Sequence, residues 1–272
     1  VSAAANERDC IHVLERSNEL TPGKYVAYDY NYRQPQTWLL ADQGIEGGFG
    51  GCCYEYGVHV KTVDAAQTIA RIRSEEVRCR QVQFRGQSSV VATAAGGVTT
   101  LDGDGIDPTD LLITEVRHVV RAVDSGLIYE NHFTATDAAL MYRPERLTPR
   151  PTINGIVTAV VQGLASDTDE FPQLNDEGRY RVQFHFDWHA PEERASRPVR
   201  MAQPFAGSDD GMHFPLRPGT EVAVAFADGD PDRPVILGAI PNTTTRSVIT
   251  KTNATLNKIK SRDGIVFQFG KD

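Results

Sequence analysis

The sequence has no apolar run long enough to cross a membrane as a helix. A membrane-spanning helix needs about 20 consecutive, mostly apolar residues, and polar or charged residues interrupt every stretch of that length in the 272-residue chain. Residues 1–9 also lack the apolar centre of a secretory signal peptide. We therefore expect no stable membrane anchor and no signal peptide.

Cysteine is scarce, and its four copies lie in the first third of the chain, at Cys10, Cys52, Cys53 and Cys79. This spacing matches neither a zinc site nor a disulfide framework. The adjacent pair Cys52-Cys53 could be a redox pair or a metal anchor. No basic residue lies next to it to activate a thiolate, and we favour incidental thiols in an exposed loop. A reducing compartment is the simplest setting for such a chain.

The chain also lacks excess positive charge and the common catalytic motifs. Its formal net charge is −8 and its pI is about 5.4, whereas nucleic-acid binding needs clustered Lys and Arg. No Gly-x-Ser-x-Gly, His-Glu-x-x-His or Walker motif occurs. We therefore expect no nucleic-acid partner, no cofactor and no enzymatic activity.

Most of the residue patterns that the chain does contain are typical of β-strands. Residues 179–188 alternate fully, which predicts a strand with one face in a core and one in water. The predicted core face carries Tyr180, Val182, Phe184, Phe186 and Trp188. Four more strands are predicted at residues 156–162, 199–205, 221–227 and 235–240. Strands at this density without helices predict a small Greek-key barrel of the OB type.

The first half of the chain predicts a mixed α+β part with one helix. Residues 24–32 read as a strand, residues 44–57 as a glycine-rich loop, and residues 64–80 as a helix capped by Asp64. Glu76 lies on the apolar stripe of this helix and should need a charged partner. Further strands are predicted at residues 90–92, 111–120 and 128–136, and prolines at 149 and 151 mark a domain boundary.

Beyond Asn242 the composition changes to Thr, Ser, Asn and Lys with few apolar residues. Ile265, Phe267 and Phe269 then alternate with other residues, which predicts a strand with an apolar face. A strand of this kind cannot bury its face alone. Winding three copies around one axis would bury it, and the tail therefore predicts the stalk of a homotrimer.

These segments resemble a known family, VgrG, the spike of bacterial type VI secretion, which is related to the hub and needle proteins of contractile phage tails. The resemblance spans residues 28–269 in the family's order. It rests on YDYNYRQP (28–35), ARIRSEE (70–76), LITEVRH (112–118), YENHFTA (129–135), DEGRYRVQFHFD (176–187), VRMAQP (199–204), PGTEV (218–222) and GDPDRP (229–234).

The resemblance implies a mainly β protein with three parts. Residues 1–148 would be the C-terminal part of a phage-hub-like domain, residues 149–242 an OB-fold domain, and residues 243–272 the start of a trimeric β-helical needle. The lysozyme domain of the phage needle has no room between Ile240 and Thr243.

The resemblance also implies a structural role with particular partners. The hub end would contact an Hcp-like tube protein, and the needle end a PAAR-like tip protein or an effector. The protein would assemble in the bacterial cytoplasm and be exported by type VI secretion to the outside or into a target cell.

Two motifs suggest metal ions, and each has a structural alternative. His185, Asp187 and His189 would share one side of the extended strand, with Glu192 and Glu193 close behind, and zinc favours such ligands. We favour the polar face of a half-buried strand, because Pro191 interrupts it. Residues 102–110 resemble a calcium loop only at their first positions, so we favour a solvated turn between strands.

Three functions compete at this stage. The first is a structural spike that punctures envelopes and carries effectors. The second is an OB-fold module that binds single-stranded nucleic acid or glycan, which would need exposed aromatic residues over a basic groove. The third is an enzyme such as a peptidoglycan hydrolase. The alternation at Phe184, Phe186 and Trp188 and the negative charge favour the first.

Overall fold

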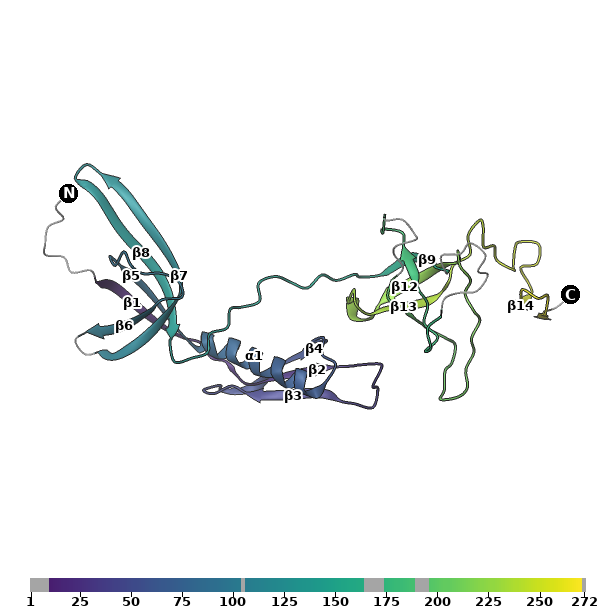
Figure 1. Ribbon diagram of the computed structural model, residues 1–272, viewed down its shortest axis with the longest axis horizontal. Coiled ribbons are helices and arrows are strands. Elements are labelled where there is room, and N and C mark those ends of the chain that lie inside the picture. Colours follow the sequence, from purple (N-terminus) through teal and green to yellow (C-terminus); the bar gives the residue numbers. More distant parts are fainter. Residues whose placement is uncertain (1–9, 104–105, 164–173, 189–195, 271–272) are drawn as a thin grey trace. The chain divides into compact units, whose positions relative to one another are not determined.

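A computed structural model describes residues 10–103, 106–163, 174–188 and 196–270 of the chain (Figure 1). The chain divides into two compact units, Val1–Thr148 and Pro149–Asp272. The described residues include no helix that is both long and apolar enough to cross a membrane.

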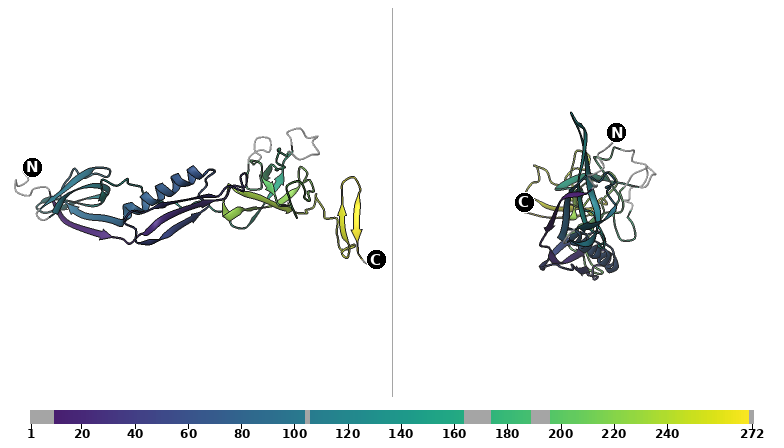
Figure 2. Two further views of the ribbon diagram at one scale, coloured as in Figure 1. Left: turned by 90° about the horizontal axis from the view of Figure 1, so that it is seen from below. Right: turned by 90° about the vertical axis from the view of Figure 1, so that its left-hand side faces the viewer.

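The first unit contains a helix packed on a small sheet. Helix α1 (Val63–Gln81) lies along one face of the sheet formed by β3 (Leu39–Gly44), β2 (Pro22–Asp29) and β4 (Gly50–Tyr56) (Figure 2). Strand β2 pairs antiparallel with β3 and parallel with β4. The side chains buried between helix and sheet include Tyr25, Ala27, Leu39, Ala41, Ala66, Ala70 and Val77. The predicted helix is confirmed within a residue at each end.

The helix is capped differently from the prediction. The N-cap is Thr62, whose hydroxyl oxygen accepts a hydrogen bond from the Ala65 backbone N–H at 3.2 Å. Asp64 lies inside the first turn instead, where its negative charge faces the positive end of the helix dipole. The partner expected for buried Glu76 is Arg73, whose Nη1 lies 2.6 Å from the carboxylate.

The predicted exposed loop at residues 44–57 is wrong in its second half. Residues there form β4, and Cys52 and Cys53 pair with Lys24 and Tyr25 of β2. The glycines make the turns that flank this strand rather than preventing it. Gly47 and Gly57 have φ of 77° and 76°, a conformation that other residues adopt only with strain.

The first unit also contains a five-stranded antiparallel sheet. Its order is β1 (Ile11–Asn18), β5 (Val82–Ser88), β8 (Gly126–Asp137), β7 (Ile106–Val123) and β6 (Val98–Gly103). Strand β1 pairs with β5 from Ile11 opposite Ser88 to Asn18 opposite Val82. The long β7–β8 hairpin confirms the two strands predicted there (Figure 1).

Two other predictions in this region are wrong in whole or in part. The strand predicted at residues 90–92 is wrong, because Val91 and Ala92 lie in a turn and the strand before them is β5. The turn predicted at residues 102–110 is wrong for most of its length, because residues 102–103 belong to β6 and residues 106–110 to β7, and residues 104 and 105 lie outside the described part.

The second unit contains a five-stranded barrel. The sheet order is β10 (Val182–Phe184), β9 (Ile156–Val161), β12 (Glu221–Phe226), β13 (Pro234–Ala239) and β11 (Arg200–Met201). Tyr180 and Val199 close the ring, since each backbone N–H donates to the other's carbonyl at 2.9 and 2.7 Å. Closure removes the open edges of the sheet. The OB-type barrel predicted from the sequence is thereby confirmed.

The barrel core contains fewer aromatic residues than predicted. Tyr180 and Val182 are fully buried and Phe184 packs partly against the core, but Phe186 and Trp188 are 64% and 86% exposed. The strand ends at Phe184, and a turn follows in which the Asp187 N–H donates to the Phe184 carbonyl at 2.9 Å. The alternation therefore stops two residues short of Phe186, and that part of the prediction is wrong.

The tail forms a hairpin of β14 (Asn257–Lys260) and β15 (Val266–Phe269). The strand predicted at the tail therefore has a companion strand in its own chain. Phe267 pairs with Ile259 and Phe269 with Asn257. The companion strand does not bury the apolar residues, because every residue of β15 is exposed.

Candidate interaction surfaces

The tail hairpin presents apolar side chains to solvent on both faces. Ile265, Phe267 and Phe269 are 74%, 61% and 57% exposed, and Val266 on the other face is 48% exposed. The Phe267 and Phe269 rings meet edge to face with centroids 5.6 Å apart. A four-residue strand pair with no apolar cover is marginally stable by itself. The hairpin therefore needs a partner surface to cover it.

A second apolar surface covers the side of the β3–β2–β4 sheet that faces away from α1. Its members are Tyr28, Trp38, Leu40, Tyr54 and Tyr56, which we call the aromatic face. In the register, Tyr28 lies between Leu40 of β3 and Tyr56 of β4. The Tyr28 ring stacks on Trp38 with centroids 6.0 Å apart and meets Tyr56 at 5.5 Å.

The aromatic face has the properties of a binding surface. Trp38 and Tyr54 are 73% and 60% exposed, and contiguous exposed apolar patches mark sites of association. Lys24 and Asp42 form an ion pair of 3.2 Å at its border. The sequence analysis missed this face, although Lys24, Val26 and Tyr28 alternate with Tyr25, Ala27 and Asp29 as a two-sided strand would.

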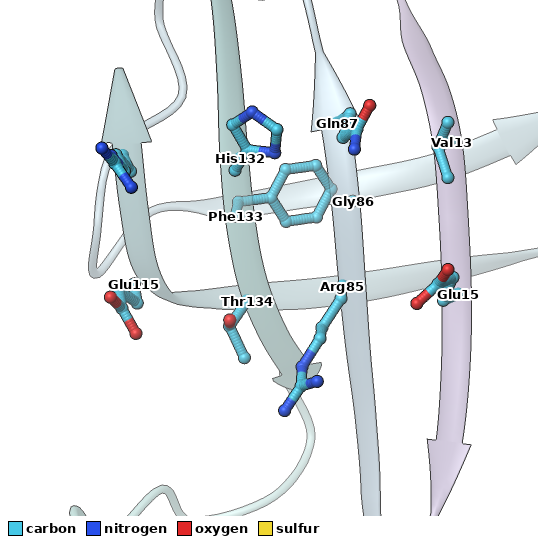
Figure 3. Close-up of a pocket in the computed structure, with 10 residues that line it drawn as sticks. Val13, Glu15, Arg85, Gly86, Gln87, Glu115, His132, Phe133 and Thr134 are labelled. Atoms are coloured by element: carbon cyan, nitrogen blue, oxygen red, sulfur yellow. The ribbon is translucent and has the colours of Figure 1, made fainter. Parts of the chain in front are cut away.

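A polar groove crosses the outer side of the five-stranded sheet (Figure 3). One row of side chains runs Glu15, Arg85, Thr134 and Glu115 across β1, β5, β8 and β7. A parallel row contains Val13, Gln87, His132 and Arg117. The charges alternate in sign across the strands. The His132 side chain is 43% exposed and its Nε2 lies 3.9 Å from the Glu130 carboxylate.

Glu55 is the centre of a charged cluster beside α1. Its carboxylate accepts hydrogen bonds from the Tyr25 hydroxyl and from both terminal nitrogens of Arg146, the latter at 2.8 and 3.0 Å. Burial alone raises the pKa of Glu55, but hydrogen bonds from Arg146 and Tyr25 outweigh it and hold this pKa below its usual value. Burial and the hydrogen bond to Glu55 raise the pKa of Tyr25. The cluster therefore links β2, β4 and the segment after β8 through one shared carboxylate.

The predicted zinc candidates are not aligned on one strand face. His185 is exposed in the turn that follows β10, and Asp187 comes after that turn. His189, Glu192 and Glu193 lie outside the described residues. The extended strand on which this candidate rested ends at Phe184. The described residues near His185 therefore offer no preset ligand geometry.

Comparison with known proteins agrees with this architecture. The model of the phage tail baseplate hub (GPD) family matches residues 1–124, and the model of the type VI secretion system/phage-baseplate injector OB domain matches residues 162–240. The spike protein VgrG1a of Pseudomonas aeruginosa is 31% identical over 94% of this chain. The chain belongs to the VgrG family.

Two further relatives show how much of this chain is shared and how much of their own length it spans. The VgrG1b spike protein of P. aeruginosa is 30% identical over 94% of the chain. The actin cross-linking toxin VgrG1 of Vibrio cholerae is 28% identical over 84%. The chain spans only 42%, 36% and 22% of the lengths of VgrG1a, VgrG1b and this toxin.

A solved structure shares the fold. A chain of the Francisella PdpA–VgrG complex, in its half-lidded form, matches this structure with a TM-score of 0.53 and 8% identity. The match covers 98% of this chain and 48% of that chain. The fold of the chain is therefore found in a solved VgrG-containing assembly, with little sequence in common.

Proposed function

We propose that this VgrG chain is a structural part of the spike of a contractile, phage-tail-like type VI secretion machine. The hub-like and injector OB matches follow one another along one chain, and this order carries the proposal. The exposed apolar hairpin supports it, because a stalk built from several copies would cover Ile265, Phe267 and Phe269. The spike would puncture the target envelope and carry effectors through it.

The proposed mechanism is mechanical. Contraction of a sheath would supply the work, and the spike would have to resist unfolding under load. A homotrimeric stalk suits this task, since strands from three chains must separate together and unfolding becomes slow. The aromatic face would be covered in the same assembly by a protein neighbour, because its flat apolar surface is unfavourable in water.

The proposed partners follow from the family. The hub end would contact an Hcp-like tube protein, and the needle end a PAAR-like tip protein or an effector. Assembly would take place in the bacterial cytoplasm, before export by type VI secretion to the outside or into a target cell. One relative supports the effector role by its name, the actin cross-linking toxin VgrG1 of V. cholerae.

We further propose that the chain has no catalytic site of its own and that toxicity comes from cargo. The sequence supports this, because none of the common catalytic motifs named above occurs in it. Incubation with peptidoglycan, nucleic acid or lipid, with zinc or calcium added, should give no turnover. Metal-dependent turnover that His185→Ala or Asp104→Ala abolishes would move the function to the enzyme class.

The decisive experiment is the native mass of the full-length protein. Analytical ultracentrifugation at micromolar concentration should give a trimer, and replacing Phe267 and Phe269 by Ser should weaken it. The matched control is Phe214→Ser, which changes a ring of similar exposure, 56%, in the barrel unit. A stable monomer at these concentrations would contradict the proposal.

One observation favours the second candidate function, an OB-fold binding module. Phe186 and Trp188 are exposed at the end of β10, and the Phe186 ring stacks on Phe184 with centroids 5.1 Å apart. Exposed aromatic rings are the platforms on which unpaired bases stack. A monomer whose tryptophan fluorescence changes on adding an oligonucleotide would favour this function over the spike.

A further inference from the structure

After β8 and a turn at residues 138–140, the chain lies against α1 and β4 in a segment without helix or strand, residues 141–148, which we call the strap. Its apolar side chains do not anchor it, because Met141 is 62% exposed and Leu147 is 83% exposed. Among the described residues, no backbone–backbone hydrogen bond joins residues 141–147 to the rest of the unit. Something other than apolar burial or strand pairing therefore holds the strap in place.

Three carboxylate–guanidinium pairs hold it, and we call them the clasp. Arg143 Nε donates to Glu75 at 2.8 Å, and Glu145 accepts from Arg80 Nη1 at 3.0 Å. Arg146 donates both terminal nitrogens to Glu55 at 2.8 and 3.0 Å. The Arg146–Glu55 pair is forked, and forked pairs are directional and stronger than single contacts between point charges.

A buried thiol lies under the strap. Cys79, near the end of α1, is 3% exposed, and its S–H donates to the Met141 carbonyl at 3.1 Å. The Arg143 backbone N–H is also directed at this sulfur. Lifting residues 141–143 would therefore remove direct covering contacts from Cys79. The reactivity of the Cys79 thiol should therefore depend on whether the strap is attached.

Salt should weaken the ion pairs of the clasp without weakening the apolar core of the first unit. Pairs between partly exposed side chains weaken as salt shortens the Debye length from about 10 Å at 0.1 M to about 3 Å at 1 M. The apolar contacts between α1 and its sheet do not depend on that screening. Segments held by few apolar contacts open at a lower free energy than the whole unit unfolds.

We propose that the strap is a releasable connector, which detaches when its clasp is broken while the first unit stays folded. The segment joins the first unit to Pro149 and the second unit. Detached, these eight residues could span up to about 26 Å at about 3.3 Å per residue. The clasp would thereby set how far the two units can separate.

The experiment measures the reactivity of Cys79 in a protein that carries Cys10→Ser, Cys52→Ser and Cys53→Ser. Neutral dithiodipyridine in excess gives a rate of thiol reaction. We expect this rate to rise about three- to tenfold between about 0.1 M and about 1 M NaCl, with no fall in the urea midpoint of unfolding. Arg143→Gln should raise it at low salt and remove most of the salt response.

The control is Lys24→Gln, which removes the exposed ion pair to Asp42 away from the strap. It should leave the rate unchanged. Loss of the Arg143 charge would by itself make the thiol harder to ionise, so a faster reaction in Arg143→Gln reports exposure. The proposal would be overturned if neither salt nor Arg143→Gln changed the rate of thiol reaction. It would also be overturned if this rate rose only when the whole unit unfolded.

Discussion

At the scale of single residues, Gly86 shows how one missing side chain positions an aromatic ring. Gly86 on β5 lies directly opposite Phe133 on β8, and the ring occupies the space above the glycine (Figure 3). A Cβ at position 86 would lie 2.2 Å from the Phe133 Cζ, closer than any real contact. The ring is 4% exposed and has little room to move.

We therefore expect Gly86→Ala to destabilise the first unit by about 1–3 kcal/mol through overpacking. Urea denaturation followed by circular dichroism measures the free energy of unfolding. The control is Gly44→Ala, at a strand position with nothing within 4 Å of the added Cβ, which should change it by less than about 0.5 kcal/mol. Equal effects of the two substitutions would contradict the close approach.

Glu55 predicts an acid sensitivity with a definite sign. Its pKa is lowered in the folded state by Arg146 and Tyr25, with Arg73 nearby. The unfolded chain therefore binds more protons as the pH falls below the usual glutamate value of 4.5. The stabilisation is present above that value and is lost as the pH falls through the lowered pKa.

The measurement is the melting temperature of the wild type and of Glu55→Gln between pH 6 and pH 3. Glutamine keeps an acceptor for the Tyr25 hydroxyl but cannot titrate, so the variant should be less stable at pH 6 and lose less on acidification. Parallel curves for both proteins would show that Glu55 does not contribute to the acid response.

At the scale of elements, the start of α1 depends on a residue that lies just before it. Thr62 is the N-cap, and its hydroxyl accepts from the Ala65 N–H. Replacing it by Ala should cost about 1 kcal/mol of unfolding free energy, because a first-turn N–H loses its partner. Asp64→Ala should cost less, since it removes a charge near the helix dipole and no cap. A larger loss of unfolding free energy for Asp64→Ala than for Thr62→Ala in urea denaturation would show that Asp64 is the cap.

Sequence patterns predicted the elements whose apolar period agrees with their packing. Val222, Val224 and Phe226 alternate and are buried in the barrel, and the bounds of α1 agree with the predicted helix. The two failures have different causes, one local and one tertiary. The run ending at Trp188 continues the alternation after a backbone turn has ended the strand, and a tertiary contact with β2 turns glycine-rich residues 50–56 into β4. Hydrogen bonds to distant strands leave no local signal.

At the scale of the whole molecule, the candidate surfaces were only partly visible in the sequence. The apolar tail was found because Ile265, Phe267 and Phe269 alternate in an otherwise polar segment. The aromatic face was missed because it combines Trp38, Tyr28 and Tyr56 from three separate segments, whose neighbourhood depends on strand order. The clasp was missed for the same reason, because Glu55 and Arg146 are 91 positions apart.

Because β1 pairs with β5, the residues between these strands form an insertion into the five-stranded sheet. Asn18 lies opposite Val82, and the Glu19 N–H donates to the Gln81 carbonyl at 2.9 Å, so the chain leaves and re-enters the five-stranded sheet at nearly one point. Residues 19–81 could therefore be exchanged for an Asn-Gly turn that joins β1 directly to β5 as a hairpin. Nuclear magnetic resonance of the shortened unit should still show the register Leu14 opposite Gly86. On this view the helix and its sheet are a transplantable cassette, which could be moved between hubs or replaced by another domain.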